Sequence, residues 1–398
     1  MIRKKIYLSP PVLFLGVWFF VISLYQMGLS RLLSKPITIL NDLFIIFGSG
    51  FCVGALLALL FRPKFRFDFA SDYRPFFLRN LGYLFWFLVS FSILEVVYEG
   101  YVPVLAMAFG QALSHFDFGI PSIHGLVIAG FSVFGTVSFG VFLTTGKRKA
   151  LYYAMVPVAY SFIIVNRKMM TICFLQYLLV FLHVRGINVR EILKATAVVL
   201  LFVFVFGLVG TIRGHTTTIE KYGKFIPEFA FPGDEGFKWI YLYITTPINN
   251  FAHTTIMHGS EGNSLPIRTF GSLVPSAIRN YLVGPNTMSR FKAASVDRYW
   301  LRSPVFNVST GFNAPYLDGG FLGVFIYSAF IGFLCTFVYL GFGNMLGLAT
   351  FSVLMSGALI TVFSNNFGNL NYVGQFLFLL MLKFPIFFKR LKRPNFNG

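Results

Sequence analysis

Long apolar runs fill most of this 398-residue chain, and they limit its fold more than any other feature. A helix of about 20 apolar residues crosses a hydrocarbon core of about 30 Å. In lipid every backbone polar group must be satisfied internally, which favours helices for runs of this length. With 56% hydrophobic and 12% charged residues, the chain has too little polar surface to cover a soluble globule. The sequence therefore predicts an all-α polytopic membrane protein.

We expect about ten transmembrane helices. The candidate segments are 11–29, 39–61, 80–98, 124–144, 150–165, 169–184, 195–212, 319–341, 345–364 and 370–388. No small-residue cleavage site follows the first run, which is therefore expected to be a retained helix rather than a signal peptide.

The basic residues predict the orientation. If the N-terminus is cytoplasmic, ten spans place five basic groups inside: Arg3 to Lys5; Arg62, Lys64, Arg66, Arg74 and Arg79; Lys147 to Lys149; Arg185, Arg190 and Lys194; and Lys389, Arg390, Lys392 and Arg393. The short outer turns keep only Arg31, Lys35, Arg167 and Lys168. The positive-inside rule favours this arrangement. It predicts a multi-pass protein of a bacterial inner membrane with both termini cytoplasmic.

One large polar loop separates the apolar segments. The expected division is residues 1–212 with seven spans, residues 213–318 as a periplasmic loop with interfacial helices, and residues 319–398 with three spans and a basic tail. The loop carries ten Lys/Arg against seven carboxylates, an excess that topology does not require. We therefore expect an anionic partner there. Much of the remaining positive charge serves topology and contacts with anionic lipid, so nucleic acid is not implied.

Aromatic and amide residues follow one another early in this loop. The run from Lys238 to Ile244 contains Trp239, Tyr241 and Tyr243, and it leads into Thr246 to Phe251. Trp and Tyr prefer the membrane–water interface. The run becomes too polar after Tyr243 to span, so we expect a helix lying in or near the interface.

Four arginines are the candidate anion ligands. Arg167 and Arg213 are expected at headgroup depth on the outer face, where two planar guanidinium groups can hold a phosphate or pyrophosphate. The alternative for each is contact with lipid phosphates. Arg279 and Arg290 stand beside Tyr281 and Phe291, whose faces suit sugar rings and cations. The alternative for both is an ordinary solvated surface.

Two residues are candidate acids or bases. His253 is expected near the membrane on the far side, as a general acid or base or as a structural histidine. Asp318 precedes Gly319 and Gly320 and a long apolar run. It is expected either to face a ligand or to cap the helix that follows. Five further titratable residues, Glu95, Glu99, His115, Asp117 and His124, surround the third span and the next outer turn.

The sequence indicates no metal site and no cofactor. His253 and His258 are five residues apart, which does not place two ligands on one helical face, and no His-Glu-x-x-His pattern is present. Cys52, Cys173 and Cys335 lie far apart within expected spans and lack metal-ligand spacing.

These features together resemble a known family. The matching pieces are Phe118 to Gly125, Asn166-Arg167, Gly210 to Arg213, Tyr241 to Asn250, and the Thr310 to Gly323 segment with its Asp-Gly-Gly-x-x-Gly pattern. Their order and the long outer loop resemble the Wzy-type O-antigen polymerases, which join oligosaccharide repeat units, and their common-antigen and capsule relatives. Where those relatives often have Asp-Phe-Gly, this chain has Asp318-Gly319-Gly320.

The resemblance implies a GT-C-like membrane glycosyltransferase. Its substrates would be glycan repeat units on undecaprenyl pyrophosphate, as donor and acceptor, and its partners the bilayer, a chain-length regulator and a flippase. It implies that Arg167, Arg213 and Arg290 engage pyrophosphate. Asp318 or His253 would then act as base, with Tyr243 and Asn249 near the glycan. A lipid-linked donor needs no nucleotide-sugar or P-loop site, and the sequence contains none.

Two alternatives remain open. An O-antigen ligase uses the same donor with a lipid A core acceptor. A transporter or flippase of lipid-linked glycans would place charged residues midway through several spans. The expected spans carry few such residues, since Asp42 and Glu95 lie near span ends.

Overall fold

The computed structural model describes residues 6–33, 39–61, 75–109, 118–121, 123–214, 223–226, 235–257, 266–274, 306 and 308–383. Side chains within these ranges are described except for 75–79, 208–214, 235, 267 and 272. The described part of the chain is helical throughout and has no strand, apart from one isolated antiparallel bridge between Ser30 and Phe225. The all-α class is therefore confirmed.

The helices follow the apolar runs. They are α1 (Pro10–Gln26), α2 (Ile39–Leu60), α3 (Pro75–Glu99), α4 (Pro103–Ala108), α5 (Ile123–Thr145), α6 (Arg148–Ile163), α7 (Arg167–Arg185), α8 (Val189–Gly214), α10 (Glu235–Met257), α11 (Ile267–Phe270), α13 (Asn313–Gly341), α14 (Met345–Leu359) and α15 (Leu370–Lys383). Short 3-10 helices add η1 (Ile6–Leu8), η2 (Gly271–Leu273) and η4 (Ile360–Val362). Each of the ten expected segments thus coincides with a helix.

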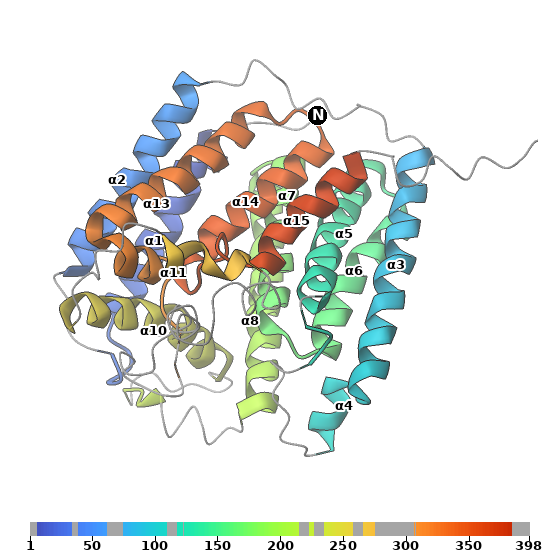
Figure 1. The fold of residues 1–398 in the computed structure, drawn as a ribbon, viewed down its shortest axis with the longest axis horizontal. Helices are drawn as coiled ribbons and strands as arrows, with labels where there is room; N and C mark the ends of the chain where they lie inside the picture. Colours follow the sequence, from blue (N-terminus) through green and yellow to red (C-terminus); the bar gives the residue numbers. More distant parts are fainter. Residues whose placement is uncertain are drawn as a thin grey trace, which may run out of the picture.

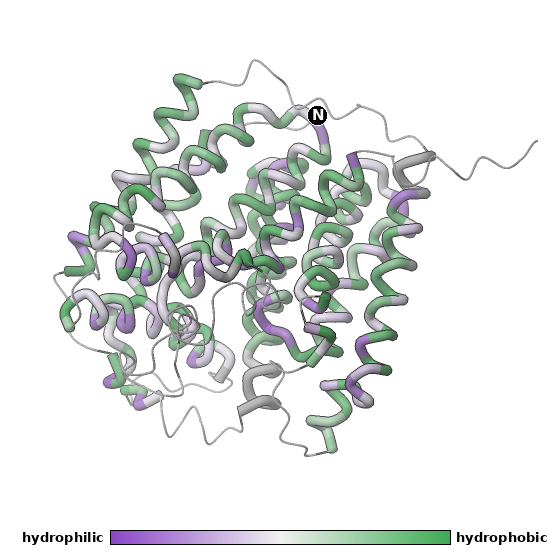
Figure 2. Tube along the Cα trace, in the orientation of Figure 1, coloured by the Kyte–Doolittle hydropathy of each residue, from purple (hydrophilic) through white to green (hydrophobic). Residues whose placement is uncertain are grey.

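Six helical segments in the described residues are long and apolar enough to cross a membrane. They are α2, α3 from Asn80, α5, α7, α13, and α14 together with η4. α1 and α15 are apolar but shorter. Figure 2 shows hydrophobic residues along most of the bundle helices. A polytopic membrane protein is consistent with this composition, while the total of ten spans stays a prediction.

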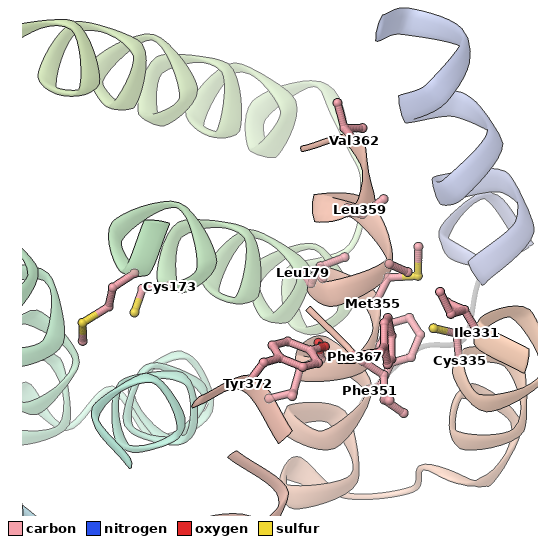
Figure 3. Close-up of a cluster of buried hydrophobic side chains, with 14 of the residues drawn as sticks. Cys173, Leu179, Ile331, Cys335, Phe351, Met355, Leu359, Val362, Phe367 and Tyr372 are labelled. Atoms are coloured by element: carbon pink, nitrogen blue, oxygen red, sulfur yellow. The ribbon is translucent and has the colours of Figure 1, made fainter. Parts of the chain in front are cut away.

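The centre of the bundle is α14, since 94% of the segment from Met345 to Val362 is buried. Figure 3 shows the side chains that surround it: Phe351, Met355 and Leu359 of α14 lie among Leu179 of α7, Ile331 and Cys335 of α13 and Tyr372 of α15. A helix that is apolar on all sides is stable in such a position because every face meets another helix.

Glycines bring α2 and α13 into backbone contact. A Cβ atom added at Gly54 would lie 1.8 Å from the Ala329 carbonyl oxygen, and one added at Gly332 would lie 2.2 Å from the Phe51 carbonyl oxygen. Small residues allow membrane helices to approach this closely, which maximises van der Waals contact where lipid offers no hydrophobic driving force.

α13 begins earlier than expected and is bent. It starts at Asn313 rather than at residue 319, and Gly319 and Gly320 have non-helical backbone angles. Gly320 has φ 60° and ψ −148°, a conformation that residues with a Cβ rarely adopt. The two glycines therefore separate a short first segment, which ends at Asp318, from the long apolar segment.

The polar segment between α8 and α13 contributes helices of its own. α10 lies crosswise to α3 and α8, with α11 above it in the view (Figure 1). The expected helix around Trp239 to Phe251 is thus confirmed as a helix, and its location at a membrane interface stays a prediction. α10 packs against α1 and α8 and carries the residues of the candidate site.

Candidate functional site: an arginine among aromatic rings

Local sequence places Arg167 at the first position of α7. The Asn166 side chain accepts a hydrogen bond from the Met169 amide, at 3.0 Å, and so caps the helix. The backbone N–H of Asn166 in turn donates to the Ser161 carbonyl of α6, at 2.8 Å. Val165 completes the tight turn with φ 53°. This short connection holds the start of α7 against the end of α6.

Three aromatic rings surround the Arg167 guanidinium group. Its central carbon lies 4.6 Å from the Tyr243 ring centroid, 5.4 Å from that of Phe206 and 5.6 Å from that of Trp239. Phe206 comes from α8, whereas Trp239 and Tyr243 are four residues apart and share one face of α10. Arginine is stabilised over aromatic faces at such distances. We call these four residues the arginine cage.

The cage leaves hydrogen-bond donors unused. Arg167 Nη2 donates to the Tyr243 hydroxyl, but Nε and Nη1 are shielded from solvent and find no hydrogen-bond partner among the described residues. No ion pair among the described residues involves Arg167. A buried charge that lacks a counterion is costly. An anion that reached the guanidinium would satisfy both donors, and the start of α7 would add a favourable helix dipole.

Asn249 lies on the same helix as Tyr243 but makes a different contact. Its side-chain oxygen accepts a hydrogen bond from the Tyr25 hydroxyl of α1, at 3.0 Å, and the residue is 2% exposed. Asn249 therefore fastens α10 to α1. Its expected place near the glycan stays a prediction.

A second buried contact fastens α10 on the same side. The Leu29 amide after α1 donates to the Tyr241 hydroxyl, at 3.0 Å. Burial raises the pKa of the Tyr241 phenol. These contacts hold α10 in a fixed position against the bundle, which in turn positions the aromatic rings of the cage.

Asp318 clamps the segment around α11 to α13. Its Oδ1 accepts from the Arg268 amide at 3.1 Å, and its Oδ2 accepts from the amide and hydroxyl of Thr269, at 2.8 and 2.7 Å. Amides in the first turn of a helix have no intrahelical acceptor, so the carboxylate caps α11 rather than the helix that follows it in sequence. With an exposed fraction of 4%, Asp318 has the surroundings of a structural carboxylate. Its role as a base stays a prediction.

The same segment is fastened a second time. Asn365 Nδ2 donates to the Thr269 carbonyl at 2.7 Å, and the Tyr327 hydroxyl donates to Asn365 Oδ1. The turn between η4 and α15 thus supports the contact that Asp318 makes.

The structure describes the other candidates only in part. His253 lies half-buried in α10. Arg213 belongs to the last turn of α8, and its side chain lies outside the described ones. Arg279 and Arg290 fall outside the described residues, as do His258, His115 and Asp117. Arg167 and Tyr243 are the expected site residues that the structure brings together.

Sequence reasoning missed two members of the cage. Phe206 is one of many phenylalanines in an expected span, and Trp239 was expected as an interfacial residue rather than as a partner of Arg167. The four-residue spacing of Trp239 and Tyr243 was the available signal for a shared helical face. A cavity of about 300 Å³ between α7 and α8 is a separate feature. Its lining is apolar apart from Thr196, so it offers no charged ligand.

No protein-family model, curated protein or solved structure matches this chain.

Proposed function

We propose that this protein is a membrane glycosyltransferase that polymerises undecaprenyl-pyrophosphate-linked repeat units into a surface polysaccharide on the periplasmic face of a bacterial inner membrane. The observation that carries the proposal is the Arg167 guanidinium, which is enclosed by three aromatic rings, lacks a counterion in the described structure and retains two unpaired donor nitrogens. This is an environment suited to an anionic group attached to an apolar or sugar-bearing molecule.

The reaction assigns a role to each part of this environment. An acceptor hydroxyl attacks the anomeric carbon of the growing chain, the bond from that carbon to the pyrophosphate oxygen breaks, and undecaprenyl pyrophosphate leaves with the bonding electrons. Arg167 would stabilise the negative charge on the leaving group by charge-assisted hydrogen bonds. Arg213 and Arg290 are proposed to extend this contact. Tyr243 keeps the guanidinium plane in place.

Purified protein in nanodiscs, incubated with undecaprenyl-pyrophosphate-linked repeat units from its own host, tests the proposal. A gel ladder spaced by one repeat unit, formed without nucleotide, is the expected product. Arg167→Ala should lower the rate by at least about 100-fold, the usual cost of removing a donor to a developing anion. Arg167→Lys should give a rate between that of the unaltered protein and that of Arg167→Ala, because lysine keeps the charge but lacks the planar guanidinium group.

Arg148→Ala is the matched control, because Arg148 is an exposed arginine at the opposite end of α6. It should leave the ladder unchanged. A normal ladder from the Arg167→Ala protein would contradict the role of the cage. Absence of a ladder from the unaltered protein, together with transfer to added lipid A core, would identify a ligase instead.

A further inference from the structure

A second polar cluster lies between α3, α5 and α6. The Glu95 carboxylate is completely buried, and its two oxygens lie 3.0 and 3.1 Å from Nδ1 of His124. The Tyr160 hydroxyl donates a hydrogen bond to Oε2 of the same carboxylate, at 3.0 Å. Three helices thus converge on one carboxylate inside the bundle, where a charged group is costly and usually functional.

The imidazole of His124 is closely covered on one side. The Phe118 ring meets it edge to face, with centroids 5.6 Å apart. The Gly119 amide donates to Glu99 Oε1 at 3.1 Å, and Gly119 has φ 100°. A Cβ atom at Gly119 would lie 2.6 Å from Nδ1 of His124, so only glycine allows the chain to pass this close. The His124 side chain nevertheless stays 19% exposed.

This geometry selects one tautomer of the imidazole. An ionised Glu95 accepts the proton on Nδ1 of His124, which leaves the lone pair on Nε2. No described residue makes a hydrogen bond to Nε2. A buried carboxylate that orients a partly exposed histidine in this way is the arrangement that lets a histidine act as a general base.

The cluster lies at the same end of the bundle as the arginine cage. Tyr160 is in the last turn of α6, and α7 begins with Arg167 after a short turn. His124 is in the first turn of α5, which packs against α6 and α7. Tyr160 of the cluster and Arg167 of the cage are thus seven residues apart in sequence, on either side of the turn between α6 and α7.

We propose that His124 is the base of the transfer reaction, with Glu95 and Tyr160 as positioning residues, an inference that rests on the proposed function. The proton of the acceptor hydroxyl moves to Nε2 of His124. The hydroxyl oxygen forms the new bond to the anomeric carbon as the bond from that carbon to pyrophosphate breaks. Glu95 stabilises the resulting imidazolium, which then releases its proton to water.

Among the described residues, the titratable groups recorded at the His124 cluster come from α3 and α6. Glu95 of α3 contacts the imidazole, Glu99 of α3 accepts from the neighbouring Gly119 amide, and Tyr160 of α6 donates to the Glu95 carboxylate. On α15, the neutral Asn371 packs beside Gly125. His115 and Asp117 lie outside the described residues.

Kinetics of ladder formation test this assignment. His124→Gln should lower kcat by about 10²- to 10⁴-fold, the usual contribution of a general base, and leave the KM for the lipid-linked unit unchanged. His124→Ala should recover activity in proportion to added imidazole, which a purely structural histidine would not allow. Tyr160→Phe should lower kcat severalfold, whereas Tyr152→Phe, a change at an exposed position of α6, should have no effect.

Nitrogen NMR of ¹⁵N-histidine-labelled protein in nanodiscs gives an independent readout of the dyad. His124 should show a proton on Nδ1, and Glu95→Leu, which removes the acceptor for that proton, should remove this preference. A wild-type kcat in folded His124→Gln protein, or an unchanged tautomer in folded Glu95→Leu protein, would overturn the assignment. A wild-type protein that forms no ladder would overturn the proposed function itself, and it is recognised before any variant is compared.

Discussion

At the scale of single residues, burial and hydrogen-bond supply separate functional candidates from structural ones. In the described part of the chain, Arg167 has two donor nitrogens without partners, whereas each oxygen of Asp318 accepts at least one hydrogen bond from the segment around α11. Unsatisfied buried groups in a folded protein call for an explanation, and a bound ligand is one. Fully satisfied groups are explained by the fold alone.

Asp318→Asn tests this distinction. The amide nitrogen of asparagine cannot accept from the Thr269 amide, so the clamp on α11 should weaken by about 1.5–3 kcal/mol, the worth of a hydrogen bond to a charged group. Thermal unfolding in nanodiscs should show a lower midpoint, and the folded protein should keep most of its polymerising activity. Unchanged stability with complete loss of the ladder would instead support Asp318 as the base.

At the scale of the elements, the α13 kink at Gly319 and Gly320 separates a long segment that packs against α2 from a short segment that contacts α11. Gly54 and Gly332 let the two helices touch, and this contact holds the long segment of α13 after Gly320. The short first segment is then free to turn toward α11 and present Asp318 to it. Helix packing therefore positions a polar contact that lies outside the apolar interface.

Gly54→Ala should destabilise the protein by about 1–3 kcal/mol, because the added methyl group would displace backbone atoms rather than a flexible side chain. Gly16→Ala in α1 is the matched control, since an added Cβ there meets nothing within 4 Å. Thermal unfolding of both variants provides the comparison. Equal midpoints for the two would show that α2 and α13 are not in backbone contact.

At the scale of the whole molecule, a buried polar network joins four helices. Gln176 of α7 accepts from the Thr136 hydroxyl of α5 at 2.6 Å and donates to Gln375 of α15 at 2.8 Å and to Ser356 of α14 at 3.3 Å. Interhelical hydrogen bonds of this kind stabilise membrane bundles. Gln176 therefore links the central helix to its neighbours.

Gln176→Leu should lower the free energy of unfolding by about 1–2 kcal/mol, because it leaves the Gln375 and Thr136 side chains without this partner. Gln26→Leu, at the exposed end of α1, should leave it unchanged. Thermal unfolding without guanidine compares the stability of the two variants with that of the wild type. Gel filtration checks that each variant is a single folded species. If the Gln176→Leu protein were as stable as the wild type, the hydrogen bonds of Gln176 would not contribute to the free energy of unfolding.

Local properties of the chain were sufficient to predict the all-α class, the helical ranges and the helix around Trp239 to Phe251. Hydrophobicity and the satisfaction of backbone groups act within one segment, so a run of apolar residues predicts a helix without knowledge of its neighbours. The Asn166 cap of α7 is equally local, since it involves residues only three positions apart, but it was not among the predictions. The number of spans, the orientation and the enzymatic activity stay predictions.

Contacts between distant segments were decided only by the tertiary structure. Arg167 meets Phe206 and Tyr243 from α8 and α10, Asp318 binds an amide fifty residues earlier in sequence, and Glu95 meets His124 from 29 residues earlier. The sequence alone identified Arg167, Tyr243 and Asp318 as polar residues in unusual positions. It left their partners open, because which faces meet depends on how all the helices pack together, and packing is a property of the whole bundle.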